Sequence, residues 1–117
     1  MEYTETVAAQ LGADGFVELS LDRTYKHGAK YIPTLYFQSD DVPQLADAIE
    51  RFARTNVVET VKLADGTVTL FTMDPNPAIH LELKRPGFAL HGGHDSLDMA
   101  PRTVSSLVAA LRAAAES

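Results

Sequence analysis

The stretch VVETVKLADGTVTLFTM, residues 57–73, constrains the fold more than any other part of the chain. Two segments rich in Val and Thr, at about 57–63 and 67–73, flank the dipeptide Asp65-Gly66. β-Branched residues favour strands, and Asp-Gly suits a tight hairpin turn that needs positive φ angles. The stretch therefore predicts an antiparallel hairpin, which needs further strands or a helix to bury its apolar face.

Other alternating segments predict more strands of the same kind. In FVELSLDR and AIHLELKR the apolar residues occupy alternate positions and would share one face: Val17, Leu19, Leu21 and Ile79, Leu81, Leu83. The segment YIPTLYF is also β-prone, and Pro33 within it indicates an edge strand or a bulge.

Two segments have the spacing of amphipathic helices. Their apolar stripes are Val42, Leu45, Ile49, Phe52 and Val104, Leu107, Val108, Leu111. Ser39, Asp40 and Asp41 are suitable N-caps for the first helix, which should end near Arg54. The predicted fold class is α+β, with an antiparallel sheet of about seven strands and both helices on one face. The expected order is β-β-β-α followed by β-β-β-β-α.

The two halves of the chain align without a gap when 62 is added to each residue number. Leu19 then meets Leu81 in the strands and Leu45 meets Leu107 in the helices, whereas residues 24–34 and 86–96 show no likeness. Any two strand–strand–helix units share some of this pattern. One register through two strands and a helix nevertheless indicates an internal repeat. We expect one domain over residues 1–117, with repeat halves 1–55 and 56–117.

The composition is that of a folded protein with an acidic surface. The 117 residues are 45% hydrophobic and 22% charged, with a formal net charge of −6 and no cysteine. The lack of cysteine excludes disulfides and thiolate metal sites and suits a reducing compartment. No signal-like segment and no apolar stretch near the roughly 20 residues of a membrane helix are present in the sequence. We expect a cytoplasmic protein with no membrane partner, whose charge disfavours nonspecific binding to duplex DNA.

The stretch HGGHDSLD, residues 91–98, most resembles a chemical site. His91, His94 and Asp95 could hold a metal ion if the two intervening glycines bend the chain, and His80 could add a ligand. Residues three apart in a strand point to opposite faces, however, so a bulge or loop is the simpler interpretation. The sequence has no nucleophile elbow or phosphate loop. We therefore expect no catalytic residues, no metal, no cofactor and no enzymatic activity.

Basic and aromatic residues gather at two predicted hairpins, DRTYKHGAKY and the matching turn of the second half. They are Arg23, Tyr25, Lys26, Lys30, Tyr31, Lys84, Arg85 and Phe88. In proteins that bind single-stranded nucleic acid, cations contact phosphates and aromatic rings stack on bases. A solvated turn with ordinary surface charge is the alternative interpretation.

A sheet of hairpins followed by one helix, occurring twice, resembles the Pur (purine-rich-element-binding) proteins, the Whirly proteins and coactivators of the positive cofactor four type. The phrases LYFQSDDVPQLADAI and LDMAPRTVSSLVAAL are similar to the strand-into-helix junction of those families. The resemblance implies binding of single-stranded nucleic acid on the open face of the sheet. In this chain the outward positions of two strands are Glu18, Ser20, Asp22, His80, Glu82 and Lys84, three of them acidic.

Two functional hypotheses follow. The first is a non-enzymatic module that binds single-stranded DNA or RNA in a regulatory role through the basic hairpins. The alternative is an acidic interaction or regulatory protein whose partner is another protein. Ile32 and Tyr36, on one face of an expected edge strand, are candidates for a protein interface, including that of a homodimer.

Overall fold

The strands form two antiparallel sheets in the computed structural model, which describes residues 2–73, 75–85 and 95–117. The elements of the first half are β1 (Tyr3–Leu11), β2 (Phe16–Tyr25), β3 (Lys30–Tyr31), β4 (Thr34–Gln38) and α1 (Val42–Thr55). Those of the second half are β5 (Glu59–Lys62), β6 (Thr67–Met73), β7 (Asn76–Lys84), β8 (Ser96–Met99) and α2 (Val104–Ala115). A short 3-10 turn precedes each helix, at Ser39–Asp41 and Pro101–Thr103.

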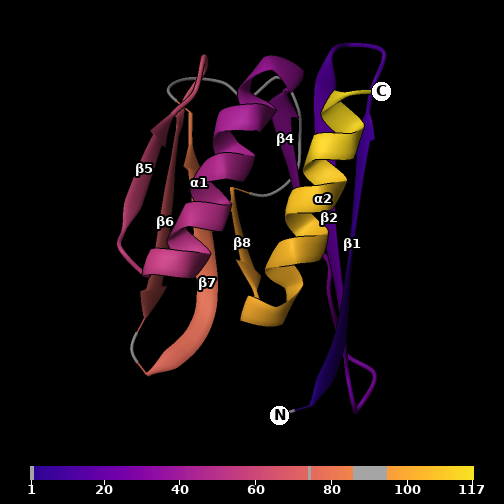
Figure 1. Cartoon of the computed structure of the whole chain (residues 1–117). Coiled ribbons are helices and arrows are strands. Elements are labelled where there is room, and N and C mark those ends of the chain that lie inside the picture. The colour runs from indigo at the N-terminus through magenta and orange to yellow at the C-terminus, as the bar shows by residue number, and fades with distance from the viewer. Residues whose placement is uncertain (1, 74, 86–94) are drawn as a thin grey trace.

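The α+β class is confirmed, but the single sheet of about seven strands is wrong. The first sheet has four strands, in which β1, β3 and β4 all pair with β2. The second is a four-stranded meander in the order β5-β6-β7-β8. Helix α1 carries the chain from β4 to β5, the far edge of the second sheet, so hairpin pairing cannot continue from one sheet into the next (Figure 1). The first half has four strands, where three were expected, because the segment YIPTLYF contributes to two strands, β3 and β4, which are separated before Thr34.

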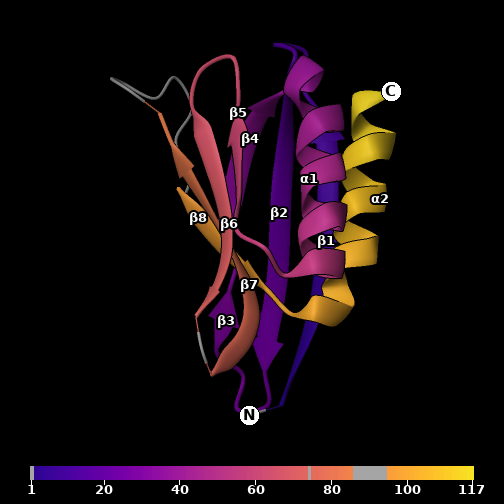
Figure 2. The ribbon, with the colours of Figure 1, turned by 60° about the vertical axis from the view of Figure 1, so that its left-hand side comes forward.

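Both helices lie on the same side of the two sheets, in contact with each other (Figure 2). The helix α2 of the second half packs mainly on β1 of the first sheet, and α1 of the first half contacts β5 and β6 of the second sheet. Arg112 of α2 donates to Asp47 and Glu50 of α1 at 2.6 and 2.7 Å. The helices are therefore exchanged between the halves: each helix contacts the sheet of the other half.

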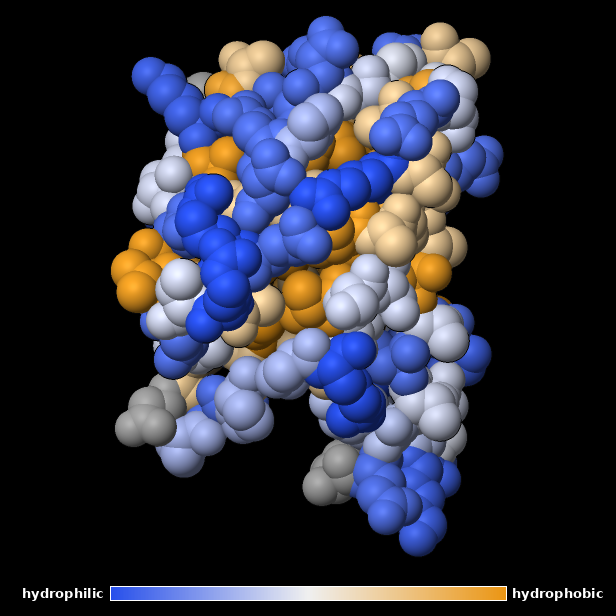
Figure 3. All heavy atoms as spheres, in the orientation of Figure 1, coloured by the Kyte–Doolittle hydropathy of each residue, from blue (hydrophilic) through white to orange (hydrophobic). Residues whose placement is uncertain are grey.

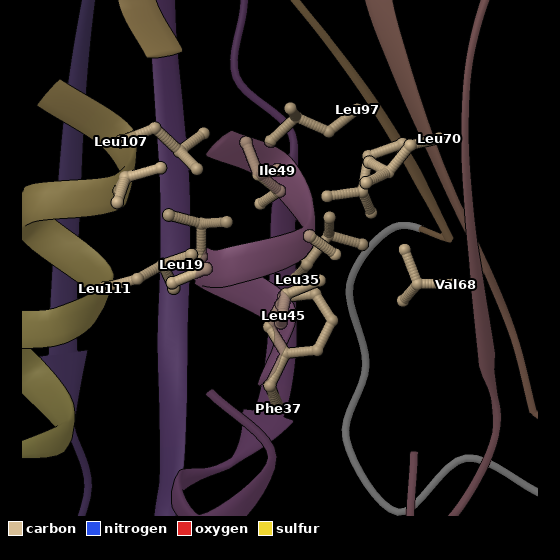
Figure 4. Packing of buried hydrophobic residues seen from close by; sticks show 14 of the residues in the cluster. Leu19, Leu35, Phe37, Leu45, Ile49, Val68, Leu70, Leu97, Leu107 and Leu111 are labelled. Atoms are coloured by element: carbon tan, nitrogen blue, oxygen red, sulfur yellow. The ribbon is translucent and has the colours of Figure 1, made fainter. Parts of the chain in front are cut away.

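The predicted alternation of buried residues is confirmed. All six residues assigned to one face of the two strands are at most 4% exposed: Val17, Leu19, Leu21, Ile79, Leu81 and Leu83. Figure 4 shows Leu107 and Leu111 of α2 beside Leu19, while Leu70 and Leu97 lie across from them near Ile49 of α1. The buried apolar side chains form one cluster drawn from both halves, so neither half completes its own core.

Equivalent elements of the two halves begin at positions that the sequence alignment sets opposite each other. The pairs of first residues are Thr34 and Ser96 for β4 and β8, Ser39 and Pro101 for the turns, and Val42 and Val104 for the helices. The positions of these elements therefore agree with the register of the alignment. The internal repeat itself stays a prediction.

The entrance of α1 differs from the expected cap. Asp41 holds the N-cap position, but its side chain makes no capping bond to a backbone N–H of the helix. Its carboxylate instead accepts from the backbone N–H of Ala64, with N–O distances of 3.3 and 3.2 Å. Asp41 therefore fastens α1 to the β5–β6 turn. At the other end Asn56, with φ 56°, closes α1 as a left-handed C-cap.

The β5–β6 hairpin is confirmed, but the expected reason for its glycine is wrong. Gly66 does not adopt a positive φ angle; positive φ occurs at Gly15 and Gly28. A β-carbon on Gly66 would instead collide with the carbonyl oxygen of Lys84 on the neighbouring strand. The constraint at Gly66 is therefore close approach of two backbones.

We expect Gly66→Ala to lower the free energy of unfolding by about 1–3 kcal/mol, because the strand carrying Lys84 must shift. Gly12→Ala is the matched control, since its β-carbon would closely approach only the carboxylate end of Asp14, at 2.9 Å, which can rotate at the cost of one exposed hydrogen bond from Phe16 N. Urea denaturation of both variants measures the difference. Equal losses would contradict the close-approach explanation.

Candidate ligand-binding site

Arg23, predicted to contact a ligand, lies buried between the two sheets. Its side chain is 9% exposed and its Nε donates to Glu5 Oε2 at 2.6 Å. Nη1 donates to the Tyr25 hydroxyl at 3.2 Å, and Nη2 donates to the carbonyl oxygen of Asp98 in β8 at 3.0 Å. Arg23 therefore joins β1, β2 and β8, with its charge matched inside the protein.

Glu5 completes this buried cluster. Its side chain is 0% exposed, and Oε1 accepts from Ala100 N at 2.9 Å and from Thr103 Oγ1 at 2.6 Å. Burial alone would raise the pKa of Glu5, but the hydrogen bonds from Thr103, Ala100 and Arg23 outweigh it and hold the pKa below its usual value. Glu5 is therefore ionised in the folded protein and fastens β1 to the entrance of α2.

Arg85 makes the reciprocal contact. It bonds Asp65 Oδ2 at 2.9 Å and donates through Nη2 to the carbonyl oxygen of Tyr36 in β4. The sequence alignment of the two halves sets Arg85 opposite Arg23 and Asp98 opposite Tyr36. Each half therefore sends one arginine, neutralised by a carboxylate, to a strand carbonyl of the other half.

The remaining predicted residues are divided between these structural contacts and the surface. The Tyr31 hydroxyl accepts from Asp98 N at 3.2 Å, and Arg23 lies 5.0 Å from the Tyr31 ring centre. Lys84 is 80% exposed and lies 3.4 Å from Glu82. Phe88 lies outside the described residues. The two predicted hairpins therefore do not supply one common set of free cations.

A pocket of about 640 Å³ opens beside the first hairpin. The turn of this hairpin, between β2 and β3, lies at the end of the molecule that carries the N-terminus (Figure 1). It is lined by Glu2, Tyr3, Thr4, Thr24, Tyr25, Lys26 and Arg102. Lys30 is not among the lining residues, but it pairs with Thr24 across the β2–β3 ladder and is exposed, so a third cation lies on the neighbouring strand. The volume is within the range of about 300–1,000 Å³ that is usual for small-molecule and nucleotide-sized sites.

Tyrosine rings contact each other and two guanidinium groups at and beside this pocket. The rings of Tyr3 and Tyr25 are 5.6 Å apart and meet edge to face. Arg23 lies 4.6 Å and Arg102 4.9 Å from the centre of the Tyr3 ring. His27 stacks on Tyr25 at 5.9 Å. The buried Arg23 thus positions Tyr3 and Tyr25, whereas Arg102 is exposed and carries its charge to the surface.

Sequence reasoning missed Tyr3 and Arg102. Tyr3 begins β1, a strand whose residues were not assigned from the sequence, although YTETVAAQL does alternate apolar with polar residues over part of its length. Arg102 follows Pro101 at the start of a helix, where it has no local mark of function. The structure brings together two residues from opposite ends of the chain, with Arg102 Nη2 donating to the carbonyl oxygen of Tyr3 at 3.4 Å.

The metal candidates are only partly described. His80 pairs through Nδ1 with Asp98, its side chain is 12% exposed, and its ring stacks on Phe71 at 5.3 Å. Asp95 accepts from Leu83 N at 2.7 Å through its carbonyl oxygen, and His91 and His94 lie outside the described residues. Within residues 2–73, 75–85 and 95–117, no three His, Asp or Glu side chains are grouped as metal ligands would be.

The outward face of the first sheet is acidic and polar. Glu18 and Tyr36 lie opposite each other there, with the Tyr36 hydroxyl donating to Glu18 at 3.4 Å. Ile32, the other interface candidate, is 46% exposed. An interface through Ile32 and Tyr36 stays a prediction.

We expect Glu5→Gln to cost about 3–5 kcal/mol at neutral pH, because it leaves the charge of Arg23 buried without its partner. Since the pKa of Glu5 is lowered by folding, its contribution is present above the unfolded value and is lost as pH falls through the folded value. Acidification from pH 7 to pH 3 should therefore destabilise Glu5→Gln by less than the wild type. Urea denaturation across this range measures both effects. Glu59→Gln, which breaks the surface pair with Arg51, is the control and should cost much less; an equal cost would contradict the buried role of Glu5.

Neither helix in the described part of the chain has the length and apolar character needed to span a membrane. No protein family model matches the chain, and no curated protein is significantly similar to it.

Proposed function

We propose that this chain is a non-enzymatic module that binds single-stranded nucleic acid at the pocket formed by Tyr3, Tyr25, Lys26 and Arg102. The observation that carries the proposal is the convergence of two tyrosines and two cations on one pocket of a chain whose net charge is −6. Cations beside aromatic rings are the elements of sequence-tolerant single-strand binding.

The chemistry of the pocket suits a nucleotide. Lys26, Arg102 and the nearby Lys30 are the phosphate contacts in this proposal. Tyr25 supplies the ring for base stacking in this proposal: a base would take the place of the His27 ring that stacks on it, while the edge-to-face contact with Tyr3 fixes its orientation. Duplex DNA presents no unstacked base to these rings, so the proposal requires a preference for single strands.

The proposal includes an internal duplication of the Pur-like type. Its support is the set of equivalent contacts that join the halves in both directions: Arg23 and Arg85 each bond the other half, and so do Asp41 and Thr103. The members of each pair stand opposite each other in the sequence alignment of the two halves. An ancestral unit that paired with a copy of itself would produce this reciprocity after fusion.

A second candidate function is binding of a protein partner on the open face of the first sheet. The outward residues of β1, β2 and β4 include Glu18 and Asp22 and no lysine or arginine. Such a face repels phosphate and attracts a basic partner. This candidate uses a different surface from the pocket, so the two can be separated by mutation.

The test is fluorescence anisotropy of labelled single-stranded and duplex oligonucleotides, titrated with protein at low and moderate salt. We expect tighter binding of the single strand. With three cations in contact, the slope of log K against log salt should be about −2. Lys26→Glu with Arg102→Glu should weaken binding at least tenfold. Lys62→Glu with Lys84→Glu is the control, since it changes the net charge equally on the exposed surface of the other sheet.

Two outcomes would contradict the proposal. Absence of binding at low salt would remove nucleic acid as the ligand and favour the protein partner. Equal weakening by both double variants would show that overall charge, and not the pocket, controls binding.

A further inference from the structure

The strand β1 has one unpaired edge. Gly12 N donates to Phe16 O and Lys26 N donates to Glu2 O, so the even-numbered residues of β1 bond β2. The N–H and C=O groups of odd-numbered residues therefore point away from β2. Among the residues that the structure describes, β1 pairs with β2 alone. The peptide groups of Glu5, Val7 and Ala9 thus face outward along this edge.

This edge lacks the features that usually prevent strand pairing. β1 runs for nine residues in unbroken register with β2 and contains no proline, lysine or bulge. By contrast β5, the outer strand of the second sheet, is four residues long and ends in Lys62. The edge of β1 is therefore open to another strand of similar length.

The surface beside the edge is apolar, and the side chains that α2 exposes there are small. Val7, Ala9 and Leu11 pack against the core but stay only partly buried, because α2 covers them incompletely. On α2, Ser106, Ala109 and Ala113 are exposed. In Figure 3, tan and pale atoms predominate midway along the side formed by α2 and β1. A second strand and helix could approach closely here.

We propose that β1 pairs with β1 of a second copy of this chain, antiparallel about a two-fold axis at Val7. Val7 then opposes its own copy and Glu5 opposes Ala9, so no like charges meet across the ladder. On the outward face Thr6 opposes Ala8. The four strands of each first sheet would join into one continuous sheet.

Charge at the two ends supports a second copy as the occupant. The β2–β3 turn, which contains Lys26, and the 3-10 turn before α2, which contains Arg102, lie toward the end that carries the N-terminus, whereas the β1–β2 turn, which contains Asp14, lies toward the end that carries the C-terminus (Figure 1). Glu2 lines the pocket beside Lys26 and Arg102, so the two cations there are opposed by one acid. A two-fold axis through the middle of β1 sets the basic end of one copy beside the acidic end of the other. This complementarity favours self-association over a partner of uniform charge.

Sedimentation equilibrium of the full chain, over a wide range of concentrations, tests the proposal. We expect the wild type to reach twice its 12.7 kDa mass. Ala9→Pro should halve that mass while leaving the melting temperature near that of the wild type, because the N–H of Ala9 makes no bond to β2. Ile32→Glu, a control on the other candidate interface, should stay dimeric.

A second variant keeps the proposal testable if Ala9→Pro fails to fold. The chain has no cysteine, so Val7→Cys introduces a single thiol at the proposed axis. Opposed residues there are about 5.5 Å apart at Cα, within the range of about 4.4–6.8 Å for disulfides. Oxidation should yield a covalent dimer. A monomeric wild type, or a dimer that Ile32→Glu abolishes and Val7→Cys does not cross-link, would overturn the proposal. Neither outcome depends on nucleic-acid binding.

Discussion

The rest of the structure depends on the buried ion pair between Arg23 and Glu5. A guanidinium that is 9% exposed is costly unless its N–H groups and charge are matched. Glu5 supplies the charge, and Tyr25 with the carbonyl of Asp98 accepts further hydrogen bonds. These partners come from β1, β2 and β8, so the arginine is satisfied only when both sheets are in place.

The exchanged helices follow from the same arrangement. Glu5 holds the entrance of α2 over β1, and Asp41 holds the entrance of α1 beside the β5–β6 turn. Each helix therefore contacts the sheet of the other half, and the apolar cluster is continuous. With Arg23 and Arg85 both engaged in holding the sheets together, the cations left to meet a ligand are those at the surface, Lys26 and Arg102 among them.

Local sequence patterns were sufficient to predict most of the strands and both helices, but not which of these elements pair with each other. The alternation around Leu19 and Leu81 and the helical stripe around Leu45 were predictable, because burial of one face repeats every second residue or every turn. The division into two sheets was not, since strand pairing beyond a hairpin is decided by contacts between residues distant in sequence. The same limit applies to charge. Arg23 and Lys26 look alike in a basic hairpin. Only their burial in the folded protein distinguishes the structural arginine from the surface lysine.

The sequence predicted only part of the candidate site, for the same reason. Tyr25, Lys26 and Lys30 share one hairpin, so sequence could group them. Tyr3 and Arg102 reach the pocket through the pairing of β1 with β2 and the contact of α2 with β1. No local sequence motif indicates either contact. Phe88 and the two histidines of HGGH lie outside the described residues, and their predicted roles stay predictions.

The most direct test of this account is an NMR titration of the isotope-labelled protein with a short single-stranded oligonucleotide. The account predicts shift changes at Tyr3, Tyr25, Lys26 and Arg102, while the arginine side-chain signal of Arg85 stays in place. Changes centred on Arg85 and Tyr36, or on the acidic face around Glu18, would contradict it, because those groups would then be contacting the ligand instead of holding the sheets together.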